Sequence, residues 1–318
     1  MSDPLPIERL LPLLPESKVG AVRRVEALTA GRSGAMVYAV TTSRGDYVLR
    51  VQSAALEPAV FTEHLRILLR AAEVRVAPPI VHVDESTRAV VSARIQGAPL
   101  PAALANPAQR EAVLLSVVDQ LRALHALDKS GIAARDPVPY TRAAWEKGRE
   151  RPGFPAWARN LGPALDGFAA MLTKDARRVV SHNDLNPGNF LWDGERAWLV
   201  DWDVSGLGHP HYDLATLAMF LRLGDDEAFA LAVRHDGAPL DDISRATFRS
   251  LRQLVALLCG LTFLSLVPDL TVREAPTLAD APSLGDIYQG MRTGQLDMRT
   301  PYAQLSMGLA LLALGVAP

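Results

Sequence analysis

Four polar residues near the middle of the chain have types and a spacing that suit phosphoryl transfer. His182, Asp184 and Asn189 follow the form H-x-D-x-x-x-x-N within "SHNDLNPGNFLW", and Asp201 follows in "WLVDWD". Carboxylate and amide oxygens are the hard ligands that Mg²⁺ prefers. Phosphoryl transfer needs a positioned acceptor hydroxyl, a metal that neutralises phosphate charge and a group that accepts the hydroxyl proton. The spacing therefore indicates Asp184 as the proton acceptor, with Asn189 and Asp201 as metal ligands.

Each of these residues also has a purely structural interpretation. The segment "NDLNPGN" is rich in turn formers, so Asp184 or Asn189 could serve only the turn. Asp201 could cap the end of a strand, and a single Asp in such a segment is usually a cap. Because the three residues occur together in register, we favour catalysis and metal binding.

Strands and helices on both sides should position these residues. The first third of the chain predicts strands in "AVRRVEAL", "AMVYAVTTS" and "DYVLRVQ", with Gly45 in the turn between the last two. A helix is predicted in "EPAVFTEHLRILLRAAE", and two more strands in "APPIVHVDESTRAVVSARIQG". From about residue 101 the periodicity is helical, except for two short strands near residues 180 and 200. We therefore expect a β-rich part with one helix, followed by a mainly helical part.

The composition favours a globular protein whose partner is a small molecule. The 318 residues include 33 Lys and Arg against 35 Asp and Glu, so no net field favours nucleic acid or an anionic membrane. The N-terminal stretch lacks the basic start of a signal peptide, and the single Cys259 cannot form an internal disulfide. The longest apolar run, residues 254–267, is shorter than the ~20 residues of a membrane span. We expect a cytoplasmic protein without a membrane or nucleic-acid partner; its oligomeric state stays open.

The polar stretch and its surroundings resemble a known superfamily. "SHNDLNPGNFLW", followed by "LVDWDVSGLGHPHYDLATLA", is similar to the aminoglycoside phosphotransferase and choline kinase superfamily, and "YVLRV", Asn183 and "DWD" resemble its choline, ethanolamine and thiamine kinase-like branch. This resemblance implies an α+β, bilobal, protein-kinase-like fold that uses ATP and Mg²⁺. The implied parts are a nucleotide-binding, β-rich lobe over residues 1–96, a hinge over 97–109 and a helical catalytic and substrate lobe over 110–318.

The resemblance also implies roles for residues outside the polar stretch. The loop in "LTAGRSGAMVYAV", a strand cation with its helix acid, and the hinge backbone would bind the nucleotide. The residues in these positions are Gly31, Ser33, Gly34, Arg50, Glu63, Ala93 and Ile95. Arg50 stands where many relatives have Lys, and it can still bind phosphate, in a bidentate manner. Asp203 could contact a second Mg²⁺ or the substrate, while His182 and Asp213 resemble structural supports of the catalytic loop.

The acceptor substrate stays open between several classes. The leading hypothesis is a kinase for a hydroxyl on a small, amine-bearing metabolite such as choline, ethanolamine, thiamine or an amino sugar. Choline itself is disfavoured, because a quaternary ammonium is best held in an aromatic cage and no Trp follows residue 221. One alternative is an antibiotic phosphotransferase with an acidic pocket, and another is a non-catalytic nucleotide-binding protein. The acids that could form such a pocket are Asp225, Asp226, Glu227, Asp236, Asp241, Asp242 and Asp269.

Overall fold

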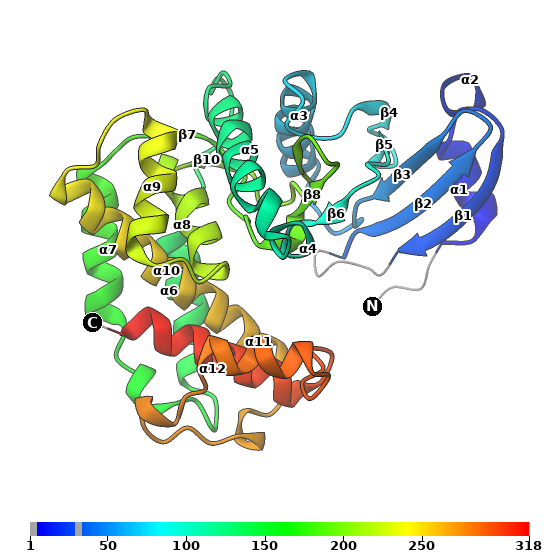
Figure 1. Cartoon of the computed structure of the whole chain (residues 1–318). Coiled ribbons are helices and arrows are strands. Elements are labelled where there is room, and N and C mark those ends of the chain that lie inside the picture. Colours follow the sequence, from blue (N-terminus) through cyan, green and yellow to red (C-terminus); the bar gives the residue numbers. More distant parts are fainter. Residues whose placement is uncertain (1–4, 29–33, 318) are drawn as a thin grey trace. The chain divides into compact units, whose positions relative to one another are not determined.

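The computed structural model describes residues 5–28 and 34–317 (Figure 1). The chain forms two compact units, one made of Met1–Ala134 and Val179–Gly208, the other of Arg135–Arg178 and His209–Pro318. The first unit contains an antiparallel sheet, and the second is helical. The predicted α+β class, with an N-terminal sheet and a larger helical part, is confirmed. The lobe boundaries given above from the resemblance stay a prediction.

A five-stranded antiparallel sheet forms the core of the first unit. The strand order β1-β2-β3-β5-β4 puts Arg50 on the central strand β3. The predicted hairpin between β2 and β3 is present, and Gly45 has a φ of 154° in its turn, which a glycine adopts without strain. The strands are β1 (Val22–Leu28), β2 (Met36–Thr42), β3 (Asp46–Val51), β4 (Ile80–Asp84) and β5 (Ala89–Ala93).

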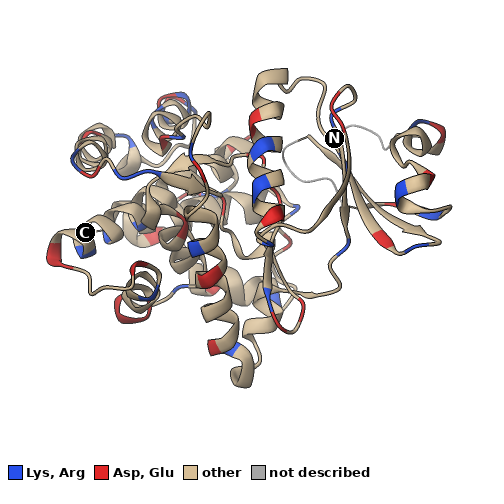
Figure 2. Ribbon diagram, turned by 90° about the horizontal axis from the view of Figure 1, so that it is seen from above, with Lys and Arg blue, Asp and Glu red and all other residues tan. Residues whose placement is uncertain are grey.

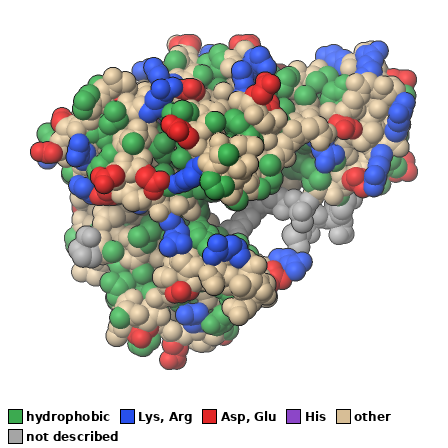
Figure 3. Space-filling view, viewed as in Figure 1, with side chains coloured by type: hydrophobic (Ala, Val, Ile, Leu, Met, Phe, Trp, Pro, Cys, Tyr) green, Lys and Arg blue, Asp and Glu red, His purple; other side chains and the backbone are tan. Residues whose placement is uncertain are grey.

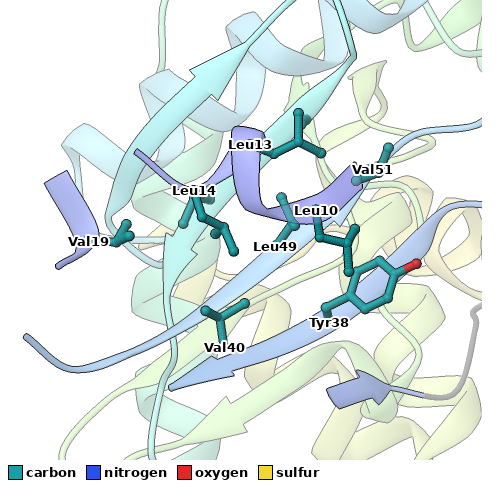
Figure 4. Packing of buried hydrophobic residues seen from close by; sticks show 10 residues of the cluster. Leu10, Leu13, Leu14, Val19, Tyr38, Val40, Leu49 and Val51 are labelled. Carbon is teal, nitrogen blue, oxygen red and sulfur yellow. The ribbon is translucent and has the colours of Figure 1, made fainter. Parts of the chain in front are cut away.

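Short N-terminal helices pack against this sheet (Figure 4). They are α1 (Ile7–Leu10), η1 (Leu11–Leu13) and α2 (Glu16–Val19). Their apolar side chains form one buried cluster with side chains of β2 and β3. The cluster includes Leu10, Leu13, Leu14, Val19, Tyr38, Val40, Leu49 and Val51. Full burial of one Leu or Val side chain contributes ~1.5–3 kcal/mol. The packing therefore fixes the strand that carries Arg50.

Helix α3 (Pro58–Glu73) packs on β5 in the first unit. Pro58 occupies its first position, where the missing N–H costs no helical hydrogen bond. Phe61 and Leu65 form a buried cluster with Val90 of β5. On another side, Arg66 donates a hydrogen bond to the carbonyl of Gly131 at 2.6 Å. This agrees with the predicted helix between the third and fourth strands.

Short elements surround the polar loop in the rest of the first unit. Helices α4 (Leu100–Leu104) and α5 (Pro107–His125) accompany a three-stranded sheet, β6-β8-β9, and the pair β7-β10. The strands are β6 (Ala98–Pro99), β7 (Val179–Ser181), β8 (Phe190–Trp192), β9 (Ala197–Leu199) and β10 (Gly206–Gly208). The sequence predicted only two strands near residues 180 and 200. Strands of three residues are too short for alternation to show them.

The second unit is built around the helix pair α10 (Asp242–Leu266) and α12 (Pro301–Val316). Gly260 permits their close approach, since a Cβ there would lie 2.7 Å from the backbone nitrogen of Leu312. The other helices are α6 (Pro137–Arg149), η2 (Ala156–Ala158), α7 (Gly162–Lys174), α8 (Pro210–Phe220), α9 (Asp225–Asp236), η4 (Leu270–Val272), η5 (Leu278–Asp280) and α11 (Leu284–Arg292). By length and composition alone, α10 could cross a membrane, a test that core helices of globular proteins also pass. It packs against α6, α8 and α12, as a core helix does.

Charged residues of both signs are mixed over the helices of both units (Figure 2). The face seen in Figure 3 likewise has Lys and Arg interspersed with Asp and Glu. This distribution follows from the nearly balanced composition.

Candidate active site

The polar loop between β7 and β8 holds Asp184 through two amide side chains. Asn189 Nδ2 donates to Asp184 Oδ2 at 3.0 Å and to the Asp184 carbonyl at 2.9 Å. Asn186 Nδ2 donates to Asp184 Oδ1 at 3.2 Å. Each carboxylate oxygen therefore has its own donor, and the side chain of Asp184 has a fixed orientation although it is only partly buried.

Two residues of this region have left-handed backbone conformations. Asn183 has a φ of 64° and Asp201 a φ of 67°. Such values are uncommon outside glycine, and they occur often at functional sites. Asn183 is held there by a 3.2 Å hydrogen bond from its Nδ2 to the Val204 carbonyl. Gly208 makes room for it, because a Cβ at that position would lie 2.6 Å from Asn183 Oδ1.

His182 links the polar loop to the segment that carries Asp201. The ring is fully buried, and its Nε2 lies 3.1 Å from the Val200 carbonyl. Its centroid is 4.7 Å from that of the Trp202 ring. The Val200 amide in turn donates to the Asn189 carbonyl at 2.9 Å. These are the contacts that a bracing residue would make.

Asp201 and Asp203 both contact the guanidinium of Arg50 on β3. Arg50 Nη2 lies 3.0 Å from Asp201 Oδ1 and also pairs with Asp203 Oδ2. Burial raises the pKa of Asp201; Arg50 opposes this shift, while the charges of Asp203 and Asp184 add to it. The raised pKa of Asp201 therefore comes mainly from removal of its carboxylate from water, with the nearby carboxylates as a smaller cause.

This donor set fits Mg²⁺. Asn189 directs its amide nitrogen at Asp184, so its Oδ1 points the other way and can coordinate a cation. Asp201 adds a carboxylate whose ionised form a divalent cation would stabilise. Within residues 5–28 and 34–317, three or more His, Cys, Asp or Glu side chains nowhere gather as a metal-holding group. A metal here would therefore rest on Asn189, Asp201 and oxygens from the nucleotide.

Of the predicted nucleotide-binding residues, Arg50 lies on β3, Ala93 at the end of β5 and Glu63 on α3 of the same unit. Gly31 and Ser33 lie outside the described residues, whereas Gly34 is exposed with a φ of 75°, which favours glycine. Glu63 accepts a 3.2 Å hydrogen bond from the Ala133 amide.

The predicted hinge residues Ala93 and Ile95 lie at and just after the end of β5. Ala93 is the last residue of that strand and donates its amide to the Pro79 carbonyl at 2.8 Å. Ile95 is half-buried just beyond.

Gln52 makes a polar contact that the sequence did not predict. Its Nε2 donates to Asp203 Oδ1 at 2.5 Å. Gln52 directly follows Val51, the last residue of β3, and its side chain contacts the same carboxylate as Arg50 does. No local signal shows this contact, because Asp203 is 151 residues away in the chain.

Asp213 lies in the second unit, fully buried in the first turn of α8. The start of this helix carries two His–Asp pairs that were also missed. His209 Nε2 lies 2.9 Å from Asp175 Oδ2, and His211 Nε2 lies 2.8 Å from Asp236 Oδ2. His209 Nδ1 accepts the His211 amide at 3.1 Å and so caps α8.

These pairs change the pKa values of their members. Burial lowers the pKa of His209 to about 4, although Asp175 opposes the shift. The hydrogen bond from Arg177 is the main cause of the lowered pKa of Asp175, with His209 adding to it. Hydrogen bonds from His211 and His235 lower the pKa of Asp236 against the effect of its burial. The cap of α8 thus depends on a neutral His209.

Curated relatives match only part of this chain. The chain is 28% identical over 129 residues to acyl-CoA dehydrogenase family member 11 of Rattus norvegicus, a match that covers 36% of this chain and 16% of that protein. It is 37% identical over 57 residues to protein LicA of Haemophilus influenzae, covering 18% of this chain and 17% of that protein. The chain therefore spans less than a fifth of the length of these relatives.

Solved structures share the fold over nearly the whole chain. A choline/ethanolamine kinase family protein from Mesorhizobium loti has a TM-score of 0.66 at 21% identity, covering 96% of this chain and 98% of its own. Choline kinase LicA from Streptococcus pneumoniae has a TM-score of 0.60 at 17% identity, covering 96% and 99%. An aminoglycoside phosphotransferase from Streptomyces rimosus has a TM-score of 0.52 at 22% identity, covering 78% and 98%. These likenesses confirm the protein-kinase-like fold.

The family itself follows from the sequence profile that the chain matches. Residues 24–254 match the profile of the phosphotransferase enzyme family, which is well over half of the chain. The match includes the polar loop and every predicted site residue. It confirms the predicted superfamily, whose profile describes phosphotransferase enzymes. The chain belongs to the phosphotransferase enzyme family.

Proposed function

We propose that this enzyme transfers the γ-phosphoryl group of ATP to a hydroxyl of a small, amine-bearing metabolite. One observation carries the proposal: Asp184 is held by Asn189 in the same compact unit in which Asp201 contacts Arg50. A proton acceptor, two oxygen ligands and a phosphate-binding cation are the groups that phosphoryl transfer needs.

Asp184 is the residue that orients the acceptor hydroxyl in this proposal. The amides of Asn186 and Asn189 fix its two oxygens, so a hydroxyl that donates to either oxygen is held in one direction. In a loose transition state the hydroxyl proton leaves late, so position matters more than basicity. Asp184 therefore needs no raised pKa for this role.

Asn189 and Asp201 would hold Mg²⁺, which supplies charge neutralisation at the phosphates when bound. The guanidinium of Arg50 would bind phosphate oxygens from the side of β3, with Glu63 on the neighbouring helix. The turn at Gly34 would present backbone amides to the phosphates. The backbone at Ala93 and Ile95 would meet the adenine edge.

The acidic residues of the second unit favour an amine-bearing metabolite over a polycationic antibiotic, because several of them already bind other groups of the protein. Asp225 pairs with Arg249 and Arg252, and Asp236 binds His211 and His235. The side chains of Asp241 and Asp269 cap the starts of α10 and η4. Four of the acids that a polycation would need thus already have structural partners.

Within the amine class, the aromatic side chains disfavour a quaternary ammonium. Phe229 packs edge-on against Phe248 at 5.9 Å between centroids, and the guanidinium of Arg249 lies 5.0 Å from the Phe229 ring. These two rings are therefore engaged inside the unit. The Plasmodium vivax ethanolamine kinase, with a TM-score of 0.63 at 14% identity, makes ethanolamine a natural first acceptor to test.

The test is ADP release from ATP and Mg²⁺ with a panel of ethanolamine, choline, thiamine, glucosamine and kanamycin. We expect acceptor-dependent turnover with a primary-amine acceptor and little with choline. Turnover with kanamycin and with no other acceptor would indicate that the substrate is an antibiotic and not a metabolite. ADP binding without turnover on any acceptor would favour the non-catalytic alternative, and Asp184→Asn provides the background rate.

A further inference from the structure

We propose, on the basis of the proposed function, that Gln52 is a positioning residue. Together with Asp203 it forms a bracket that holds the Arg50 guanidinium ready for the nucleotide phosphates. The bracket consists of these three side chains, two from β3 and its end and one from the segment after β9.

The geometry gives each oxygen of Asp203 a separate task. Oδ2 pairs with Arg50 Nη2, and Oδ1 accepts from Gln52 Nε2. The Asp203 and Arg50 side chains are 19% and 23% exposed, so water competes only weakly for these contacts. With both oxygens engaged from β3, the carboxylate plane of Asp203 cannot turn without the loss of a hydrogen bond.

This arrangement solves a conflict at Asp201. Arg50 also contacts Asp201 at 3.0 Å, but Asp201 is the carboxylate that would ligate Mg²⁺. An arginine held only by Asp201 would compete with the metal for that oxygen. Asp203 offers Arg50 an anchor outside the metal site, and Gln52 keeps that anchor in one orientation. An arginine side chain loses rotamer freedom when it binds phosphate, so a fixed anchor should improve phosphate affinity.

The first test measures ADP and adenosine affinity by calorimetry in the presence of Mg²⁺. Gln52→Leu should weaken ADP binding about tenfold, equal to ~1.4 kcal/mol, the range of one hydrogen bond to a charged group. Adenosine, which has no phosphate, should change less than about twofold. Kinetically, the KM for ATP should rise about tenfold while kcat stays within about threefold.

The matched control is Gln253→Leu. Gln253 is also half-buried, and its Nε2 donates one hydrogen bond, to the Ala317 carbonyl at 2.7 Å. This variant loses a comparable contact in the second unit and should bind ADP like the wild type. Equal losses of ADP and adenosine affinity in Gln52→Leu would indicate general damage to the sheet and would overturn the positioning role.

A double-mutant cycle tests whether Gln52 acts through Asp203. In an Asp203→Ala background, which has no acceptor for Gln52 Nε2, Gln52→Leu should change ADP affinity by less than about twofold. Additive effects, or wild-type ADP affinity in Gln52→Leu alone, would overturn the bracket. Electron paramagnetic resonance with Mn²⁺ and ADP gives a further test. If the wild type binds two Mn²⁺ ions and Asp203→Asn binds only one, Asp203 is a metal ligand and the bracket is overturned. If the wild type itself does not bind Mg²⁺ and ADP, the proposed function fails instead.

Discussion

The exchange Asp184→Asn separates the catalytic role of this residue from its structural role. The substitution keeps the side-chain size but turns one oxygen into an NH₂ group. The amide donors of Asn189 at 3.0 Å and Asn186 at 3.2 Å each need an oxygen. The new side chain can satisfy Asn189 and will then place a donor against the donor of Asn186.

The two expected magnitudes differ enough to be told apart. Loss of the longer hydrogen bond at a partly exposed site should cost ~1 kcal/mol of stability, which lowers the melting temperature by about 2 °C. Loss of the proton acceptor should reduce kcat by about 10²–10⁴-fold, equal to ~2.7–5.4 kcal/mol in the barrier. The activity loss therefore exceeds anything that partial unfolding could cause.

The assay compares kcat, ADP affinity and melting temperature of this variant with those of Asn186→Ser. The serine keeps an oxygen for the cap on the Gly188 amide but cannot reach Asp184 as the Asn186 amide does. It should lose similar stability and less than about tenfold in kcat. The reasoning is refuted if Asp184→Asn keeps more than a tenth of wild-type kcat, or if it loses ADP binding while kcat at saturation is unchanged.

Three further predictions concern the metal ligand, the cap of α8 and the helix pair of the second unit. Asp201→Ala should abolish turnover at every Mg²⁺ concentration and leave the circular dichroism spectrum unchanged; ordinary activity would remove Asp201 from the metal site. The pKa of His209 is about 4 in the folded state, below its unfolded value of about 6.5. Between these pH values the unfolded state binds more protons, so the free energy of unfolding should fall as the pH drops from 6.5 towards 4. Denaturant titrations should show a weaker pH dependence of the unfolding free energy in His209→Asn, which can still cap α8. The same pH dependence in the variant and the wild type would exclude His209 as its source. Gly260→Val should destabilise the chain by more than ~3 kcal/mol, because its side chain would meet the α12 backbone at Leu312; an unchanged melting temperature would contradict this packing.

The residues for which the sequence predicted roles were those with local signals. Asp184, Asn189 and Asp201 lie within one short stretch, and their spacing alone indicated phosphoryl transfer. The strands and α3 followed from periodicity and turn residues, since these features are also local. Gln52 was missed because its partner Asp203 is 151 residues away in the chain.

The His–Asp pairs at the start of α8 show the same limit. Pro210 in "HPHYD" is typical of a helix start, yet Asp175 and Asp236 come from two other helix ends. Nothing in the sequence pairs residues that far apart. The left-handed backbone at Asn183 is easier to foresee, since Asn adopts it more readily than most residues, whereas Asp201 at the same φ region depends on its surroundings.

The division of the chain between the units has a consequence for its synthesis on the ribosome. Arg50 belongs to the segment that ends at Ala134, but its partners Asp201 and Asp203 are in the second segment of that unit, Val179–Gly208. At about 5–20 residues per second, several seconds separate the emergence of the two segments. During this interval residues 135–178 leave the ribosome without α8 to α12, the rest of their own unit. The nascent chain thus exposes two incomplete cores at the same time. A chaperone would have the longest time to bind residues 135–178.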